Sequence, residues 1–216
     1  MGRDANKLQN KAVELGTEYH TADVADRNSV AAAFAAAVKK NGAITILVNN
    51  AGAVETAPFA RMDDEVWDRL IAVNLTGVYN CTRLAISAMT EAGSGRVINI
   101  ASTAALKGYP YVSAYCAAKH GVVGLTRALA LEYATKGVTI NAVCPGYTNT
   151  EIIEQAIDKI VAATGRSRDE ALAELVKANP QRRLVEPEEV AETVLWVCRQ
   201  ESINGQSVAV AGGEVM

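Results

Sequence analysis

The sequence predicts an α/β protein in which helices cover both faces of a doubly wound parallel sheet. Short runs rich in β-branched residues alternate with longer segments of helical periodicity, the order expected when helices connect parallel strands. Runs such as Ile44–Val48 are apolar on both faces, as in strands buried between two helical layers. With 216 residues, 50% of them hydrophobic, the chain can bury a sizeable core, and we expect one domain over residues 1–216.

The predicted elements follow from these periodicities, and several helices begin at Asp, Ser or Pro, the residues preferred at helix starts. The stretch at about 150–186 is longer than a usual crossover, which favours either a helical, lid-like insertion over a site or a solvated helical excursion. The predicted strands are Glu18–Asp23, Ile44–Asn49, Arg96–Ala101, Val138–Val143 and Ser207–Val210. The predicted helices are Ser29–Lys39, Asp63–Glu91, Ser113–Lys136, Glu151–Thr164, Arg168–Asn179 and Pro187–Arg199.

Composition excludes several classes of partner. The net charge of -3 is spread along the chain, so no basic stripe is offered to nucleic acid. No apolar run approaches the roughly 18 residues that span a bilayer, and the polar opening lacks the apolar core of a secretory signal, so we expect no membrane partner. His20 and His120 show no metal-ligand spacing, and we expect no metal site. The cysteines are scattered without CxxC pairs, which indicates reduced thiols in a cytoplasmic protein.

Tyr115 and Lys119 form the most informative pattern. A four-residue spacing on a helix places the phenol and the ammonium on one face, where a cation favours the phenolate and lowers a pKa that is ordinarily near ~10. Ser102 ends a predicted strand, and the carboxyl end of a strand in an open α/β sheet presents its side chains to a ligand. Taken singly, these patterns are also typical of an ordinary helix face and of a serine that ends a strand.

These residues occur in one order and spacing with three further motifs: Asn49-Asn50-Ala51-Gly52, Asn74 with its neighbours, and Pro145-Gly146. In these motifs the sequence resembles the short-chain dehydrogenase/reductase family from about Asp23 to Gly213. The resemblance implies a Rossmann-like, NAD(P)-dependent oxidoreductase that interconverts a secondary alcohol and a ketone, with a small 3-hydroxyacyl or 3-oxoacyl compound as substrate.

The resemblance also implies a role for each catalytic position. Tyr115 would act as general acid/base on the substrate oxygen, and Ser102 would hydrogen-bond the same oxygen. Lys119 would lower the pKa of the tyrosine and hold the nicotinamide ribose. Asn74 would bind a water that completes a proton relay to solvent, although a helix-interior amide that bonds only to backbone is the alternative interpretation.

The cofactor contacts are implied in the same way, residue by residue. Arg3 lies in the predicted loop near the adenosine ribose, where a basic residue favours the 2′-phosphate of NADP over NAD. Besides Tyr115 and Lys119, the implied cofactor contacts are Asp23 and Val24 beside the adenine, Asn50, Ala51 and Gly52 along the ribose, and Pro145, Gly146, Thr148 and Thr150 near the nicotinamide and phosphates. Substrate-side positions are Ala104, Ala105, Leu106, Tyr109 and Tyr111, with an ordinary loop as the alternative.

The sequence departs from its family at the N-terminus. Family members begin with a strand and a Gly-rich turn that receives the pyrophosphate, and neither is found here, so the chain is interpreted as N-terminally truncated. An alternative function is therefore a catalytically silent family member that serves as an oligomeric scaffold or nucleotide sensor. By resemblance, the helices around residues 63–91 and 113–136 would form a homo-oligomer, a tetramer or a dimer.

Overall fold

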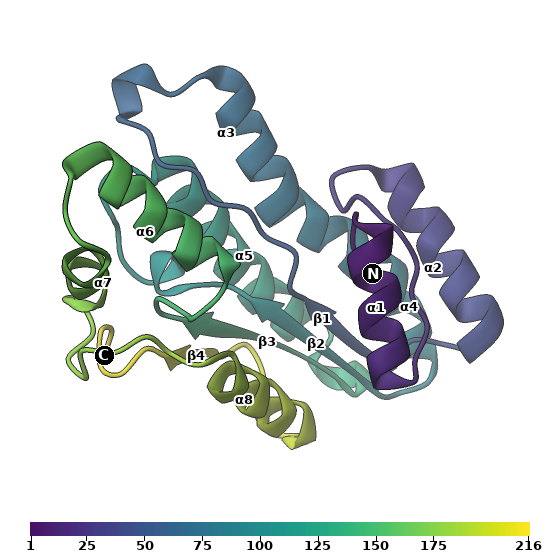
Figure 1. Ribbon diagram of the computed structural model, residues 1–216. Coiled ribbons are helices and arrows are strands. Elements are labelled where there is room, and N and C mark those ends of the chain that lie inside the picture. The colour runs from purple at the N-terminus through teal and green to yellow at the C-terminus, as the bar shows by residue number, and fades with distance from the viewer.

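The computed structural model describes residues 1–216 and contains a four-stranded parallel sheet in the order β1-β2-β3-β4 (Figure 1). This architecture confirms the predicted α/β class. Each β-strand lies within two residues of a predicted one at both ends. The strands are β1 (Ile46–Asn49), β2 (Gly95–Ile100), β3 (Val138–Pro145) and β4 (Ser207–Val210).

Helices cover both faces of the sheet. In Figure 1, α4 and α5 lie behind the strands and α8 lies in front of them. The predicted helix over residues 63–91 is one continuous rod in which a π-helical turn, Ala72–Thr76, joins α3 to α4. The helices are α1 (Ala5–Leu15), α2 (Arg27–Asn41), α3 (Asp64–Ile71), α4 (Gly77–Glu91), α5 (Ser113–Glu132), α6 (Glu151–Thr164), α7 (Arg168–Val176) and α8 (Pro187–Arg199).

The core consists of two layers, one on each side of the central strands. Val97 and Ile140 pack against α4 and α5, whereas Ile98 and Val143 pack against Val197 of α8. All five side chains are fully buried. Neighbouring residues of β2 thus bury opposite faces, as expected for strands of a covered parallel sheet.

Strand β1 does not follow this pattern. Ile46 and Val48 are 52% and 41% exposed, while Leu47 between them is buried. The reason is that α8 packs on β2, β3 and β4 and leaves the corresponding face of β1 uncovered. The prediction that this strand is buried on both faces was therefore wrong.

The predicted strand Glu18–Asp23 is also absent. A strand persists only when a neighbour continues its hydrogen-bond ladder. Here Thr21 forms a single bridge with Gly2, and the Ala22 amide donates to the Gly2 carbonyl at 2.8 Å. Residues Glu18–Asp23 therefore form an extended segment without a regular hydrogen-bond ladder.

Helix α1 was not predicted, although the sequence carries its end signals. The Asp4 carboxylate accepts a hydrogen bond from the Lys7 amide at 3.0 Å and caps the N-terminus. Gly16 ends the helix in the left-handed conformation, at φ 59°. An Asp and a Gly at this separation were the available evidence for a helix.

The segment between β3 and β4 forms a helical unit outside the sheet. Ile153 and Ile157 of α6 pack against Ala171 of α7 in a small separate core. Helix α7 ends at Val176, three residues earlier than predicted. None of the helices is both long enough and apolar enough to cross a membrane.

Candidate active site

A cavity of about 730 Å³ lies at the carboxyl ends of β1, β2 and β3, where open α/β sheets bind their ligands. The loop after each of these strands contributes to its wall, and α5, α6 and α8 close it. Nine of the predicted site residues line it: Asn50, Gly52, Ser102, Tyr115, Lys119, Pro145, Gly146, Thr148 and Thr150.

Ser102 and Tyr115 meet at the floor of this cavity. Ser102 follows β2, and its hydroxyl accepts a hydrogen bond from the Ala104 amide at 3.1 Å, which caps a short 3₁₀ turn. Tyr115 stands in the first turn of α5, and its phenol and the Ser102 side chain line the same cavity. Two hydroxyl groups thus converge on one point, as a carbonyl oxygen requires for binding and protonation.

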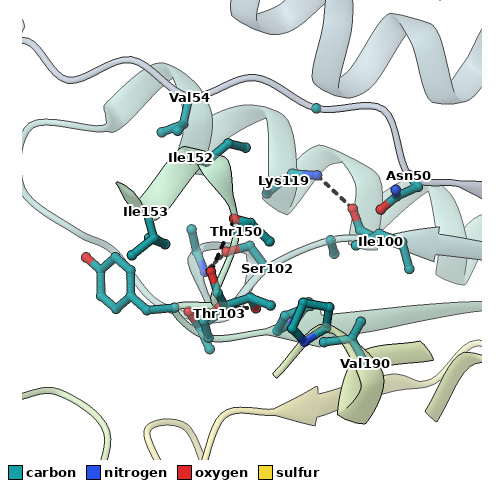
Figure 2. Close-up of a pocket in the computed structure, with 18 of the residues that line it drawn as sticks. Asn50, Val54, Ile100, Ser102, Thr103, Lys119, Thr150, Ile152, Ile153 and Val190 are labelled. Carbon is teal, nitrogen blue, oxygen red and sulfur yellow. Dashed lines mark hydrogen bonds between the residues drawn. The ribbon is translucent and has the colours of Figure 1, made fainter. Parts of the chain in front are cut away.

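Lys119 is buried one helical turn further along α5 and is 4% exposed. Its ammonium donates to the Ile100 carbonyl at 2.7 Å and lies 5.6 Å from the centroid of the Tyr115 ring (Figure 2). Burial lowers the pKa of Lys119 to about 8. The group can therefore gain or lose a proton near neutral pH, which an ordinary lysine does not do.

The pKa of Tyr115 is raised, in contrast to the downward shift expected from the sequence. Burial is the largest cause, because it disfavours the phenolate, and the neighbouring Ser102 side chain opposes this rise in the pKa. Lys119 lies on the same helix face as predicted, but its ammonium is directed to the Ile100 carbonyl. In this structure, desolvation therefore sets the direction of the shift in the pKa of the phenol.

Asn74 is fully buried in the π-helical turn between α3 and α4. Its amide donates to the carbonyls of Leu70 and Ala53, at 2.9 and 2.8 Å, and its oxygen accepts from the Ala53 amide at 3.1 Å. Every side-chain contact is with backbone, as in the alternative interpretation of this residue. Asn74 thereby holds the loop after β1, and π-helical turns of this kind are frequent at functional sites.

Gly52 lies between Asn74 and Lys119. A methyl group on Gly52 would be 3.2 Å from the Asn74 oxygen and 3.9 Å from the Lys119 nitrogen. A side chain at this position would therefore crowd the Asn74 oxygen, while the distance to the lysine would be an ordinary van der Waals contact.

The loop after β3 supplies two hydroxyl groups to the cavity. The Thr148 hydroxyl donates to the Gly146 carbonyl at 3.0 Å, and the Thr150 hydroxyl donates to the Thr148 carbonyl at 3.2 Å. The Val185 amide donates to the Tyr147 carbonyl at 2.9 Å, which fastens this loop to the chain leading into α8. Two hydroxyl groups and a backbone glycine are thus held along one wall.

Four predicted site residues do not line the cavity: Asp23, Val24, Ala51 and Asn74. Asp23 caps its own turn by accepting from the Ala25 amide at 2.9 Å. Val24 packs in the core, and its carbonyl accepts from Asn80 at 2.9 Å. The structure therefore separates the implied adenine contacts from the catalytic cavity.

The substrate-side prediction is met in part. Ala104 and Tyr109 line the cavity, whereas Ala105 and Leu106 belong to the core on the α5 side and Tyr111 is 63% exposed. Sequence reasoning missed the apolar wall, whose members come from distant elements. Val54, Ile152 and Ile153 lie on the other side of Ser102 from Val190 of α8 (Figure 2). A helical apolar periodicity in α6 and α8 was the only available signal, and it is equally typical of core residues.

No group of three or more His, Cys, Asp or Glu side chains lies close enough together to hold a metal ion. The polar groups of the cavity are hydroxyls, amides and one amine. These groups suit hydrogen bonding to a ribose, a carboxamide and a carbonyl oxygen.

A family model described as short chain dehydrogenase matches residues 1–179. The chain belongs to the short-chain dehydrogenase family. This membership confirms the resemblance noted in the sequence, and with it the assignment as an oxidoreductase enzyme of a family that uses NAD(P).

Relatives with described activities extend over most of the chain. A D-beta-hydroxybutyrate dehydrogenase of Rhizobium meliloti (strain 1021) is 38% identical over 198 residues, 90% of this chain and 77% of that protein. An acetoacetyl-CoA reductase of the same organism is 37% identical and covers 93% of this chain and 80% of its own length. A 3-oxoacyl-[acyl-carrier-protein] reductase of Thermotoga maritima is 35% identical, over 90% of this chain and 75% of its own.

A solved structure of a ketoreductase has the same fold as this chain. The crystal structure of an actinorhodin polyketide ketoreductase variant with NADPH superposes with a TM-score of 0.93 at 36% identity. The match covers 99% of this chain and 85% of that one. The short-chain dehydrogenase fold therefore extends over the whole of residues 1–216.

Proposed function

We propose that this short-chain dehydrogenase transfers hydride reversibly between NAD(P) and a secondary alcohol or ketone, with 3-hydroxyacyl and 3-oxoacyl compounds as substrates. The observation that carries the proposal is the convergence of Ser102, Tyr115 and Lys119 at the floor of a largely apolar cavity. The substrate class is supported by the relatives, whose names specify hydroxybutyrate, acetoacetyl-CoA and 3-oxoacyl groups.

The proton chemistry follows from the positions of these groups. In the reductive direction, the Ser102 hydroxyl holds the carbonyl oxygen and the Tyr115 hydroxyl donates its proton to it. Lys119, with its pKa lowered to about 8, can then return a proton to the phenolate. Oxidation of the alcohol uses the same groups in reverse. The nicotinamide, when bound, supplies or accepts the hydride.

Asn74 would complete the relay by holding a water beside Lys119. Both hydrogens of its amide are used by backbone carbonyls, so such a water has only the second lone pair of the Asn74 oxygen or a neighbouring carbonyl to bind. The role of Asn74 is therefore proposed as positioning of the loop after β1 together with this acceptor function.

The residues of the cavity fit the nicotinamide half of NAD(P). Asn50, Thr148 and Thr150 offer hydrogen-bonding groups, and Lys119 can reach a ribose hydroxyl across the bare backbone of Gly52. We propose NADP rather than NAD on the strength of Arg3, a cation that suits a 2′-phosphate. Asp23, Val24 and Ala51 would contact the adenosine outside this cavity.

We further propose that residues 1–216 act as a single domain in which α6 and α7 cover the substrate. Ile152 and Ile153 of α6 already contribute to the apolar wall. The large apolar side chains exposed on α4 and α5 support assembly of a homo-oligomer through these helices: Tyr79, Leu84 and Leu131. The four free cysteines suit a cytoplasmic location.

The test is calorimetric titration of the purified chain with NADPH and NADH, followed by a turnover assay with acetoacetyl-CoA. Binding of NADPH with turnover would support the proposal. A version extended at its N-terminus by the corresponding Gly-rich segment of a relative serves as the comparison. Turnover in neither version would contradict the proposed reaction, and binding without turnover would favour the nucleotide-sensor alternative.

A further inference from the structure

The turn that follows β4 brings a carboxylate under the substrate side of the cavity. Gly212 and Gly213 both adopt positive φ angles, 57° and 90°, and the Glu214 amide donates to the Ala211 carbonyl at 3.0 Å. The Glu214 side chain is 1% exposed. A carboxylate buried to this extent must be paired to be tolerated.

The partners of Glu214 all belong to the segment after β2 that carries Ser102. The Tyr109 hydroxyl donates to Oε1 of Glu214, and Lys107 Nζ lies 3.1 Å from the same oxygen. Lys107 Nζ also lies 4.9 Å from the centroid of the Tyr109 ring. The Tyr109 hydroxyl is 2.7 Å from Oγ1 of Thr103, the residue next to Ser102. One carboxylate thus holds Lys107 and Tyr109, and Tyr109 in turn contacts Thr103.

The same turn also contacts the loop after β3 and the segment just beyond α7. Oε2 of Glu214 is buried without a hydrogen-bond partner, and a methyl group on Gly146 would lie 3.0 Å from it. A side chain on Gly212 would collide with Asn179, just beyond α7. The loop after β2, the loop after β3 and the end of the α6–α7 unit therefore all meet at this turn.

We propose that Glu214 is a positioning residue for substrate binding: by fixing the Tyr109 hydroxyl and Lys107, its carboxylate holds the Tyr109 ring as a wall of the cavity. The ring lines the cavity while its hydroxyl points to Glu214. Burial, with a contribution from Glu214, raises the pKa of Tyr109 and keeps the phenol a donor. The inference rests on the proposed ketone reduction and concerns how tightly the ketone is held.

The test compares Glu214→Ala, Glu214→Gln and the matched control Glu201→Ala, which removes a side chain that is 89% exposed. With saturating NADPH and acetoacetyl-CoA, Glu214→Ala should raise KM about tenfold, the effect expected when a hydrogen bond to a charged group is lost. We expect kcat and the Kd of NADPH to stay unchanged. The amide oxygen introduced by Glu214→Gln can still accept from Tyr109 but cannot form an ion pair with Lys107, so this variant should raise KM less.

Hydrogen exchange provides a readout that does not need turnover. Glu214→Ala should accelerate exchange of the amides of residues 103–112 and leave those of β2 and α5 unchanged, with no effect in the control. Unchanged exchange at residues 103–112 would overturn the inference. So would a fall in kcat and in cofactor affinity that is as large as the rise in KM in both Glu214 variants. If no variant turns over but exchange responds as described, the proposed function fails and the positioning contact stands.

Discussion

Replacing Tyr115 with Phe tests the proposed chemistry most directly, because the change removes one oxygen and almost no volume. The ring keeps its place in the first turn of α5, and the Ser102 hydroxyl keeps its hydrogen bond from the Ala104 amide. The change removes only the interaction of the phenol with the neighbouring Ser102 side chain. The free energy of unfolding should therefore fall by no more than about 1 kcal/mol.

The effect on turnover should be much larger. Proton transfer by a positioned side chain contributes about 10²–10⁴ in rate, or about 3–5 kcal/mol of barrier. The hydrogen bond to the Ser102 side chain comes from the Ala104 amide, and the Lys119 ammonium donates to the Ile100 carbonyl, so neither group replaces the phenol as the acid. We thus expect kcat to fall by at least about a hundredfold, while the Kd of NADPH stays the same.

The assay is NADPH oxidation in the presence of acetoacetyl-CoA, with calorimetry for cofactor binding and urea titration for stability. Tyr79→Phe is the matched control, because Tyr79 is 42% exposed on α4 and does not line the cavity. A Tyr115→Phe enzyme with kcat within about threefold of the parent chain would refute the assignment of Tyr115 as the acid.

Three further predictions concern the lysine, the buried polar network and cofactor choice. The pKa of Lys119 is about 8 in the folded chain against an ordinary 10.5, so the unfolded state binds more protons between these two pH values. The free energy of unfolding of the parent chain should therefore rise, relative to that of Lys119→Met, as the pH increases through this range. The same pH dependence of the urea-unfolding free energy in both chains would contradict this. Asn99→Ala should cost about 2–3 kcal/mol in urea unfolding, since the buried Asn99 amide accepts from Asn49 at 2.8 Å and donates to Thr126 at 2.9 Å; a loss below about 0.5 kcal/mol would show that the network is dispensable. Arg3→Ala should weaken NADPH binding and leave NADH binding unchanged in calorimetry, and equal effects on both would exclude a 2′-phosphate contact.

Local geometry explains why much of the site could be predicted from sequence. The spacing of Tyr115 and Lys119 places both on one face of any α-helix, whatever the rest of the fold. Ser102 was found because it follows a buried strand, and the carboxyl ends of parallel strands share one edge of the sheet. The strands themselves were recognisable because the central ones are apolar on both faces, as Val97 and Ile98 show.

The features that escaped prediction depend on contacts between distant segments. The exposure of Ile46 and Val48 depends on which strands α8 covers, and the local sequence of β1 does not indicate this. The upward shift in the pKa of Tyr115 depends on burial by surrounding loops. The enclosure of Glu214 likewise requires the turn after β4 to meet a loop about a hundred residues earlier in the chain.

The contacts that hold the proton-transfer groups are independent of those that would bind the adenosine end of the cofactor. Ser102, Tyr115 and Lys119 are fixed by β2 and α5, and Asn74 is fixed by backbone groups of its own helix and of the loop after β1. Asp23 lies outside the cavity and is held by its own turn. Changes near Asp23 should therefore alter cofactor affinity and leave the protonation of Lys119 untouched. Changes at Tyr115 should lower turnover and leave cofactor affinity unchanged, so binding and chemistry can be measured as separate properties of one chain.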